Sequence, residues 1–245
     1  MEATSKLTTS LNAILIEKQK SLPIIPSLLI LAGYIGILLV RRADWLPKSW
    51  SVIPIIETAW MPFLLVLGVI IWMRVQKIPL EHVGLGTFKP SLSLLLLVFG
   101  TMVVDSVAIG IATPVVDSLF AEAQPLARFQ ALPGNLPLLL LVLPLSWVIV
   151  FGEEFFFRGF LLTALAETLG ASRVAWVAAV VIQAVGFGFI HLYQGPAQAI
   201  SIGIGGMVYG ATYLLAGKSL WPLILAHGIN NTLGLILLYS GAIVR

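Results

Sequence analysis

The sequence predicts an all-α fold, a polytopic transmembrane helical bundle of about seven spanning helices. Hydrophobic residues make up 59% of the 245 residues and charged residues 10%, against roughly 25% charged in an ordinary soluble domain. Mean hydropathy is +1.02, and several apolar stretches approach or exceed the length of about 20 residues that a spanning helix needs. These stretches are continuous rather than alternating, which favours helices over a β-barrel.

Seven apolar stretches are expected to span the membrane, and proline or glycine lies in most of the breaks between them. In chain order they cover residues 22–40, 52–73, 91–113, 135–152 (with an apolar continuation to about 166), 174–193, 197–216 and 220–240. The intervening segments 114–133 and 75–90 are too polar to span and are expected to be loops, with a short interfacial helix in each as the alternative. We therefore expect a multi-pass integral protein of the cell membrane, with N-terminal spans in residues 1–134 and a helical core in residues 135–245.

Composition excludes several classes of protein. So few charged residues cannot cover the surface of a water-soluble enzyme. The net charge of +3 comes from scattered basic residues, which suits loops at anionic headgroups and gives no basic patch for a nucleic acid. The chain has no cysteine, so it has neither disulfides nor thiolate metal sites.

Three ionisable residues interrupt the fourth apolar stretch. Each charge near a helix centre costs about 2.5–3.5 kcal/mol, and such residues usually face a bundle interior or a wet cavity. Glu154 and Arg158 are spaced i,i+4 and share one helix face, whereas Glu153 lies about 100° round the helix. The alternative is a helix end at the headgroups, but residues 159–165 stay apolar.

Two of the three histidines also lie in apolar stretches. His191 follows Phe187 by four residues, and His227 precedes Asn231 by four. Each alone is compatible with an interfacial or helix-bridging hydrogen bond. Together with the carboxylate pair, they indicate that costly polar groups of three helices meet in one hydrated pocket.

Such a pocket suits hydrolysis. A carboxylate can take a proton from water while an imidazole orients that water, and an amide with a second imidazole can hold an oxyanion. A metal site is the alternative, since Glu153, His191 and His227 could bind Zn²⁺ with one open position.

Two further features concern the rest of the bundle. Gly206 and Gly210 form a small-xxx-small step that predicts close helix packing. Asp105 and Glu57 lie in other apolar stretches, and Asp105 is expected to hydrogen-bond inside the bundle.

Three four-residue-spaced motifs, all in apolar helices and in this order, carry a family resemblance: Glu153-Glu154-x-x-x-Arg158, Phe187-x-x-x-His191 and His227-x-x-x-Asn231. Over residues 135–240 the chain resembles the CPBP family of intramembrane proteases, which includes CAAX endopeptidases and bacterial Abi or bacteriocin self-immunity proteins. The resemblance implies an intramembrane endopeptidase acting on a membrane-associated peptide or protein, lipidated or not, within the lipid bilayer. Composition already gives no nucleic-acid partner, and a homo-oligomer remains possible.

The resemblance also implies roles for the motif residues. Glu153 would activate water, with His191 orienting it, and His227 with Asn231 would form the oxyanion site. We expect no cofactor to be required, because no third histidine ligand lies in a spanning helix; Zn²⁺ remains the alternative.

The remaining motif residues would support the site. Glu154 and Arg158 would brace it as an ion pair, although Glu154 could share the carboxylate work, and Phe187 is expected to contact substrate. Two other functions are kept as alternatives: a proton-coupled transporter with a relay of acidic residues and His191, and a non-catalytic membrane binding or immunity protein.

Overall fold

A computed structural model of the chain describes residues 22, 32, 54–120 and 130–242, and in these residues every regular element is a helix. The elements are α3 (Pro54–Val75), the 3-10 helix η2 (Leu80–Val83), α4 (Leu92–Leu119), α5 (Leu136–Glu153), the π-helix η4 (Glu154–Leu161), α6 (Leu162–Thr168), α7 (Arg173–Ile190), the 3-10 turn η5 (Leu192–Gln194), α8 (Pro196–Leu215) and α9 (Trp221–Tyr239). The all-α prediction is confirmed.

Among the described residues, five helices are long and apolar enough to cross a membrane: α4, the continuous helical segment Leu136–Thr168 formed by α5, η4 and α6, and then α7, α8 and α9. The protein is thus a multi-pass integral membrane protein. The count of about seven spans is not confirmed. The expected span 22–40 lies outside the described residues except for Leu22 and Ala32, and the side chains of α3 are described only from Phe63.

One expected boundary is wrong. The segment from residue 114 was expected to be a loop, but α4 continues through Pro114 to Leu119. The end was expected there because residues 114–133 are too polar to span a membrane, and Pro114 itself removes one backbone N–H from the helix interior. Thr113 Oγ1 donates to the Ile109 carbonyl at 2.8 Å, so a side chain partners a backbone acceptor beside the interruption.

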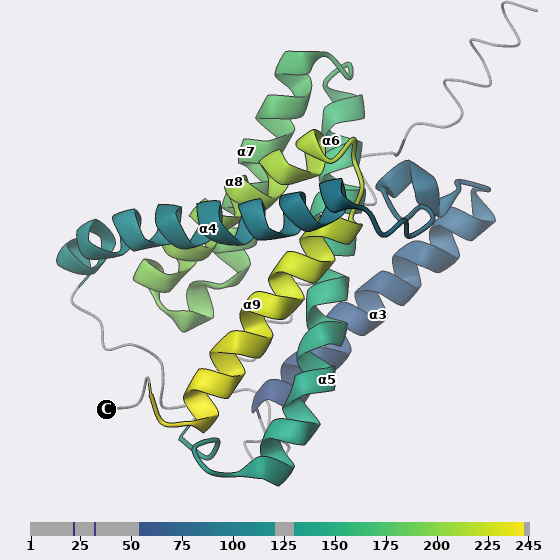
Figure 1. Cartoon of the computed structure of the whole chain (residues 1–245). Coiled ribbons are helices and arrows are strands. Elements are labelled where there is room, and N and C mark those ends of the chain that lie inside the picture. Colours follow the sequence, from purple (N-terminus) through teal and green to yellow (C-terminus); the bar gives the residue numbers. More distant parts are fainter. Residues whose placement is uncertain (1–21, 23–31, 33–53, 121–129, 243–245) are drawn as a thin grey trace, which may run out of the picture.

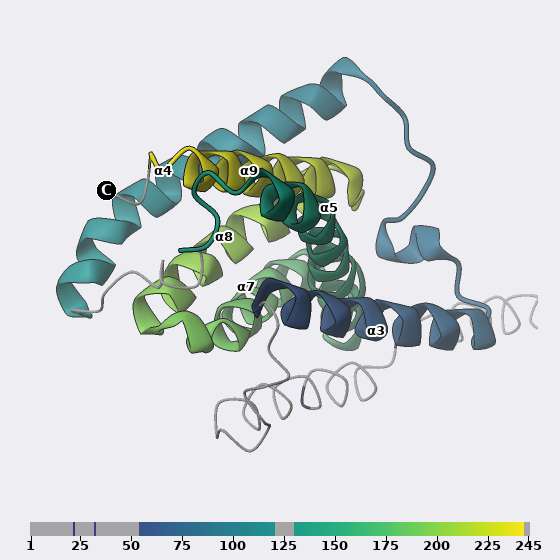
Figure 2. The same ribbon diagram turned by 90° about the horizontal axis from the view of Figure 1, so that it is seen from below.

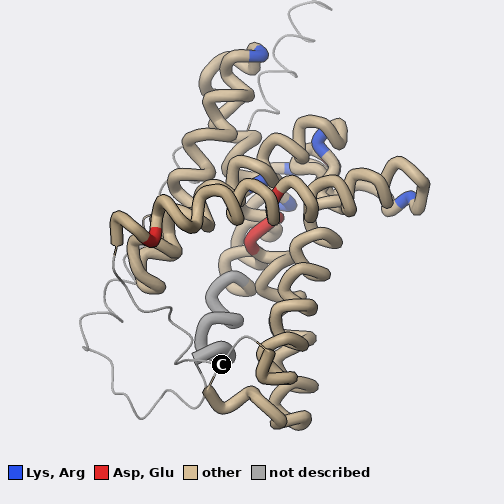
Figure 3. Tube along the Cα trace, turned by 60° about the vertical axis from the view of Figure 1, so that its left-hand side comes forward, with Lys and Arg blue, Asp and Glu red and all other residues tan. Residues whose placement is uncertain are grey.

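The helices form a bundle in which α7 packs along α8, α5 packs against α3 and α9, and α4 crosses both α8 and α9 (Figure 1). The view from below places α3 and α4 on opposite sides of the bundle (Figure 2). Charged residues are sparse along the traced helices (Figure 3).

Small residues bring α7 and α8 together, as the small-xxx-small step predicted. A Cβ at Gly206 would lie 3.2 Å from the Ala184 Cα, and one at Gly210 would lie 2.8 Å from the Gln183 amide nitrogen. The space these glycines leave lets Gln183 Nε2 donate to the Gly206 carbonyl at 2.9 Å. This bond fixes the two helices beside the functional site.

The π-helix η4 is at the centre of the core, and all eight of its residues are buried. π-Helical segments are rare and are frequently found at functional sites. Gly159 lets the η2 segment approach this helix, because a Cβ there would lie 2.6 Å from the Val83 carbonyl oxygen. The polar residues at the start of η4 are consequently surrounded by packed protein.

Candidate active site

The junction of α5 and η4 carries the three ionisable residues of the first motif. Glu154 is 0% and Arg158 1% exposed, and Arg158 Nη1 donates to Glu154 Oε1 at 3.1 Å. The two residues, called the buried pair below, therefore lie inside the bundle rather than at an exposed helix end. Glu153 precedes them at the last position of α5.

His227 of α9 contacts both glutamates. Its Nδ1 lies 2.7 Å from Glu154 Oε1, and because an ionised carboxylate only accepts, Nδ1 is the donor. Its Nε2 faces Glu153 Oε2 at 3.9 Å. The single oxygen Glu154 Oε1 thus orients both Arg158 and His227.

His191, which caps the C-terminal end of α7, approaches Glu153 from another direction. Its Nδ1 donates to the Phe187 carbonyl at 2.7 Å, and its Nε2 faces Glu153 Oε1 at 3.8 Å. Each Glu153 oxygen is therefore faced by one imidazole Nε2. Both distances are too long for a direct hydrogen bond and leave room for a bridging water.

Burial divides the site into two layers. The side chains of Glu153, His191 and His227, called the Glu153 triad below, are 13%, 10% and 18% exposed. The buried pair beneath them is at most 1% exposed. The Glu153 triad is therefore the more accessible layer, and the buried pair is suited to orienting it.

Phe187 lies between the two layers. The Arg158 guanidinium carbon is 4.1 Å from its ring centroid, the His191 ring centroid is 4.7 Å away, and Phe187 is 5% exposed. These contacts fix Arg158 and His191 in place. Contact of Phe187 with substrate stays a prediction.

Asn231 lies one turn after His227 on α9 and is half-buried; among the described residues its amide has no hydrogen-bond partner. Its neighbour Asn230 donates through Nδ2 to the Tyr209 hydroxyl at 3.4 Å. Tyr209 of α8 is 5% exposed, and its ring centroid lies 5.4 Å from that of His227. Tyr209 could not be predicted from the sequence, because a tyrosine in an apolar, glycine-rich helix gives no catalytic signal.

Asp105 of α4 is 9% exposed and interacts electrostatically with His227, Arg158 and Glu154. The expected hydrogen bond inside the bundle is not found in the described part of the chain: Asp105 Oδ1 is buried without a partner. The reason is its neighbour on α8, Gly205, whose missing side chain leaves space but supplies no donor. The other acidic residue, Glu57, belongs to α3, where its side chain is not described.

The Glu153 triad is also the set considered for Zn²⁺. Two ligands of a tetrahedral zinc at about 2.0–2.1 Å lie roughly 3.3 Å apart, whereas the imidazole nitrogens lie 3.8 and 3.9 Å from the Glu153 oxygens. No group of three His, Asp or Glu residues in the described ranges has a geometry that could hold a metal. In this arrangement the separations between the Glu153 oxygens and the imidazole nitrogens are about 0.5 Å wider than those of an ideal tetrahedral zinc site.

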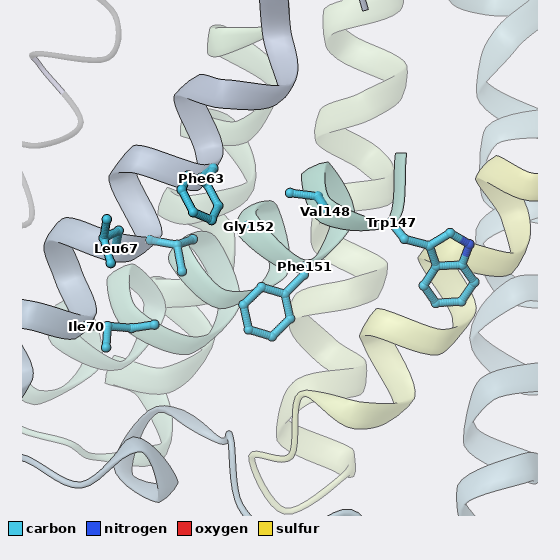
Figure 4. Close-up of a pocket in the computed structure, with 8 residues that line it drawn as sticks. Phe63, Leu67, Ile70, Trp147, Val148, Phe151 and Gly152 are labelled. Atoms are coloured by element: carbon cyan, nitrogen blue, oxygen red, sulfur yellow. The ribbon is translucent and has the colours of Figure 1, made fainter. Parts of the chain in front are cut away.

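An apolar groove of about 430 Å³ lies between α3 and α5, beside the site (Figure 4). Its lining residues are apolar or aromatic and come from both helices: Phe63, Val66, Leu67, Ile70, Trp147, Val148, Phe151 and Gly152. Gly152 directly precedes Glu153 in the chain. The groove therefore comes within one residue of Glu153 along α5, although no member of the Glu153 triad lines it.

Comparison with known proteins agrees with the family resemblance. Residues 135–233 match the family model described as Rce1-like: Type II CAAX prenyl endopeptidase Rce1-like. The matched range contains all three motifs, the buried pair and the Glu153 triad. No curated protein and no solved structure matches the chain.

Proposed function

Because the chain carries a domain of the Rce1-like CAAX endopeptidase family over residues 135–233, we propose that it is an intramembrane protease in which Glu153 activates a water to cleave a membrane-associated peptide or protein. One observation carries the proposal: each Glu153 oxygen is faced by one imidazole Nε2, at 3.8 and 3.9 Å. A carboxylate in this position can bind a water molecule that also donates a hydrogen bond to an imidazole nitrogen.

In the proposed reaction Glu153 is the general base. A water held between Glu153 and His191 gives one proton to the Glu153 carboxylate while its oxygen bonds to the substrate carbonyl carbon. The carbonyl oxygen becomes an oxyanion. When the C–N bond breaks, Glu153 returns the proton to the leaving amine, so the carboxylate is regenerated.

His227 and Asn231 would stabilise the oxyanion. In its imidazolium form, His227 donates through Nδ1 to Glu154 and has Nε2–H available for the oxyanion, while the Glu154 carboxylate compensates the charge. The half-buried Asn231 amide, one turn away, can donate to the same oxygen. The buried pair would hold His227 in this orientation without touching substrate.

We propose a metal-free reaction, which the separations of 3.8 and 3.9 Å between the Glu153 oxygens and the imidazole nitrogens favour over ligation of one zinc ion. An unchanged cleavage rate after dialysis against a strong chelator would support this mechanism. Loss of activity that added Zn²⁺ restores would instead assign the Glu153 triad to a metal.

The direct test uses a prenylated C-terminal peptide and its unprenylated counterpart with the full chain in proteoliposomes. Glu153→Gln should lower kcat by about 10²–10⁴-fold, the usual contribution of a general base, and His227→Ala by about 10²–10³-fold as an oxyanion donor is lost. Glu81→Gln, at an exposed position of η2, is the matched control. Cleavage by Glu153→Gln at the wild-type rate would show that Glu153 is not the general base. Proton flux through the wild-type protein without peptide cleavage would favour a transporter.

We further propose that the apolar part of the substrate lies in the groove between α3 and α5. Leu67→Trp, in the groove, should raise KM about tenfold or more, as steric misfit in an apolar pocket costs about 1–3 kcal/mol. Ile71→Trp, on the same helix and 55% exposed outside the groove, should leave KM unchanged. Equal effects of both variants would argue against this groove.

A further inference from the structure

Polar atoms without partners gather on the α4 side of the site, behind His227. Three of them are buried and have no hydrogen-bond partner within the described residues: Asp105 Oδ1, Glu154 Oε2 and Arg158 Nε. A fourth is the Tyr209 hydroxyl, which accepts from Asn230 but whose hydrogen has no acceptor among the described residues. Buried polar groups are nearly always hydrogen-bonded, so such a cluster requires a physical explanation.

These four groups lie within electrostatic range of one another. Asp105 interacts electrostatically with Glu154 and Arg158, and Tyr209 with Asp105, Glu154 and Arg158. The Arg158 guanidinium carbon lies 5.6 Å from the Tyr209 ring centroid. They come from α4, α8 and η4; α4 and η4 both contact α8, and α4 and α8 both contact α9.

The chemistry of the four groups complements a water molecule. The carboxyl oxygens of Asp105 and Glu154 accept hydrogen bonds, and Arg158 Nε–H and the Tyr209 O–H donate them. A buried water makes about three, and at most four, such bonds. The two acceptors match its two hydrogens and the two donors match its two lone pairs.

The sequence around Asp105 keeps this space open. A Cβ at Gly205 would lie 2.9 Å from Asp105 Oδ1, so a side chain there would press on the carboxyl group. Gly205 precedes Tyr209 by one helical turn and lies on the same face of α8. The absence of a side chain at Gly205 therefore lets the Asp105 carboxyl group lie against α8, one turn from Tyr209.

We propose that Asp105 and Tyr209, with Glu154 and Arg158, form an internal water site that supplies the hydrolytic reaction from the α4 side of the bundle. This proposal rests on the proposed protease function, in which each cleaved bond consumes one water inside the lipid layer. The groove for the apolar part of the substrate lies between α3 and α5, and α3 and α4 are on opposite sides of the bundle (Figure 2). Water and substrate would thus reach the Glu153 triad by different routes, with His227 lying between Glu154 and Glu153.

X-ray hydroxyl-radical footprinting of the full chain in lipid nanodiscs tests the water site without a substrate, because the radicals form from water bound beside the labelled side chain. Tyr209 should be oxidised clearly faster than Tyr213, which is 0% exposed on the same helix and pairs with Thr163. Asp105→Leu should lower the labelling of Tyr209, and Asp105→Asn, which keeps an acceptor oxygen, should preserve most of it. Labelling of Tyr209 at the Tyr213 rate in the wild-type protein would overturn the proposal.

Kinetics test whether the site supplies the reaction. Asp105→Leu and Tyr209→Phe should each lower kcat about tenfold, the size expected for one lost hydrogen bond, with KM unchanged. Asp117→Leu, at an exposed position of the same helix, and Tyr213→Phe are the controls and should retain the wild-type kcat. Unchanged kcat in both test variants would overturn the role of the site in supplying water. If Tyr209 were labelled in a protein that cleaves no peptide, the water site would stand and the proposed protease function would fail.

Discussion

Removing the charge of Arg158 tests how the buried pair supports the site. Arg158 is 1% exposed, donates to Glu154 Oε1 at 3.1 Å and lies 4.1 Å above the Phe187 ring. Arg158→Met fills a similar volume but leaves the buried Glu154 carboxylate with His227 as its remaining hydrogen-bond partner. Because the side-chain volume is kept, a change in stability reports the loss of the charge rather than the loss of packing.

The expected cost follows from this burial. Removing one partner of a buried ion pair costs about 3–5 kcal/mol, and a desolvated cation–π contact contributes about 2 kcal/mol. We therefore expect the free energy of unfolding to fall by about 4–5 kcal/mol, towards the upper end of the ion-pair range. Activity should fall as well, because Glu154 would no longer be held against His227.

Reversible unfolding by SDS in mixed micelles, followed by fluorescence of the seven tryptophans, measures this free energy. Arg173→Met, at the exposed start of α7, is the control and should change it by less than about 0.5 kcal/mol. The double variant Glu154→Leu/Arg158→Met should regain part of the lost stability, since no unpaired charge remains, yet stay inactive. A loss below about 1 kcal/mol in Arg158→Met, or a double variant less stable than the single one, would refute the reasoning.

Three further variants test the packing around the site by the same unfolding assay. Gly228→Ala should cost about 1–3 kcal/mol by overpacking, because its Cβ would lie 2.4 Å from the Trp147 indole, and Trp147→Leu in the same chain should restore stability; no rescue would contradict this contact. Gln183→Leu should cost about 0.6–1.7 kcal/mol, the range for hydrogen bonds between membrane helices, since its amide bridges α7 and α8. Thr101→Val should cost a similar amount through loss of its 3.0 Å bond to Thr212, and unchanged stability in both would show that these bonds do not hold the helices.

The fold class could be predicted because hydropathy decides it. A chain with 10% charged residues can satisfy its backbone in lipid only as helices or a closed barrel, and long apolar stretches select helices. The extension of α4 past Pro114 could not be predicted, since a proline in isolation signals a helix end. The π-helical turn after Glu153 depends on the packing of its aromatic residues, which no local pattern encodes.

The convergence of the site residues could also be anticipated. Glu153, His191 and His227 are costly in lipid, and helices that carry such residues are expected to turn them towards one another. The choice of partners could not be anticipated, because it depends on helix rotation: His227 Nδ1 meets Glu154, and its Nε2 is left for Glu153. Tyr209 gave no signal, since tyrosine costs little in an apolar helix.

Cleavage of a membrane-anchored peptide in ¹⁸O-labelled water by the purified full chain tests the central claim most directly. The Glu153 mechanism predicts one ¹⁸O atom in the newly formed carboxyl group of the product, and no such product above background with Glu153→Gln. Intact peptide after prolonged incubation with the folded wild-type protein, or equal ¹⁸O incorporation by Glu153→Gln, would contradict it.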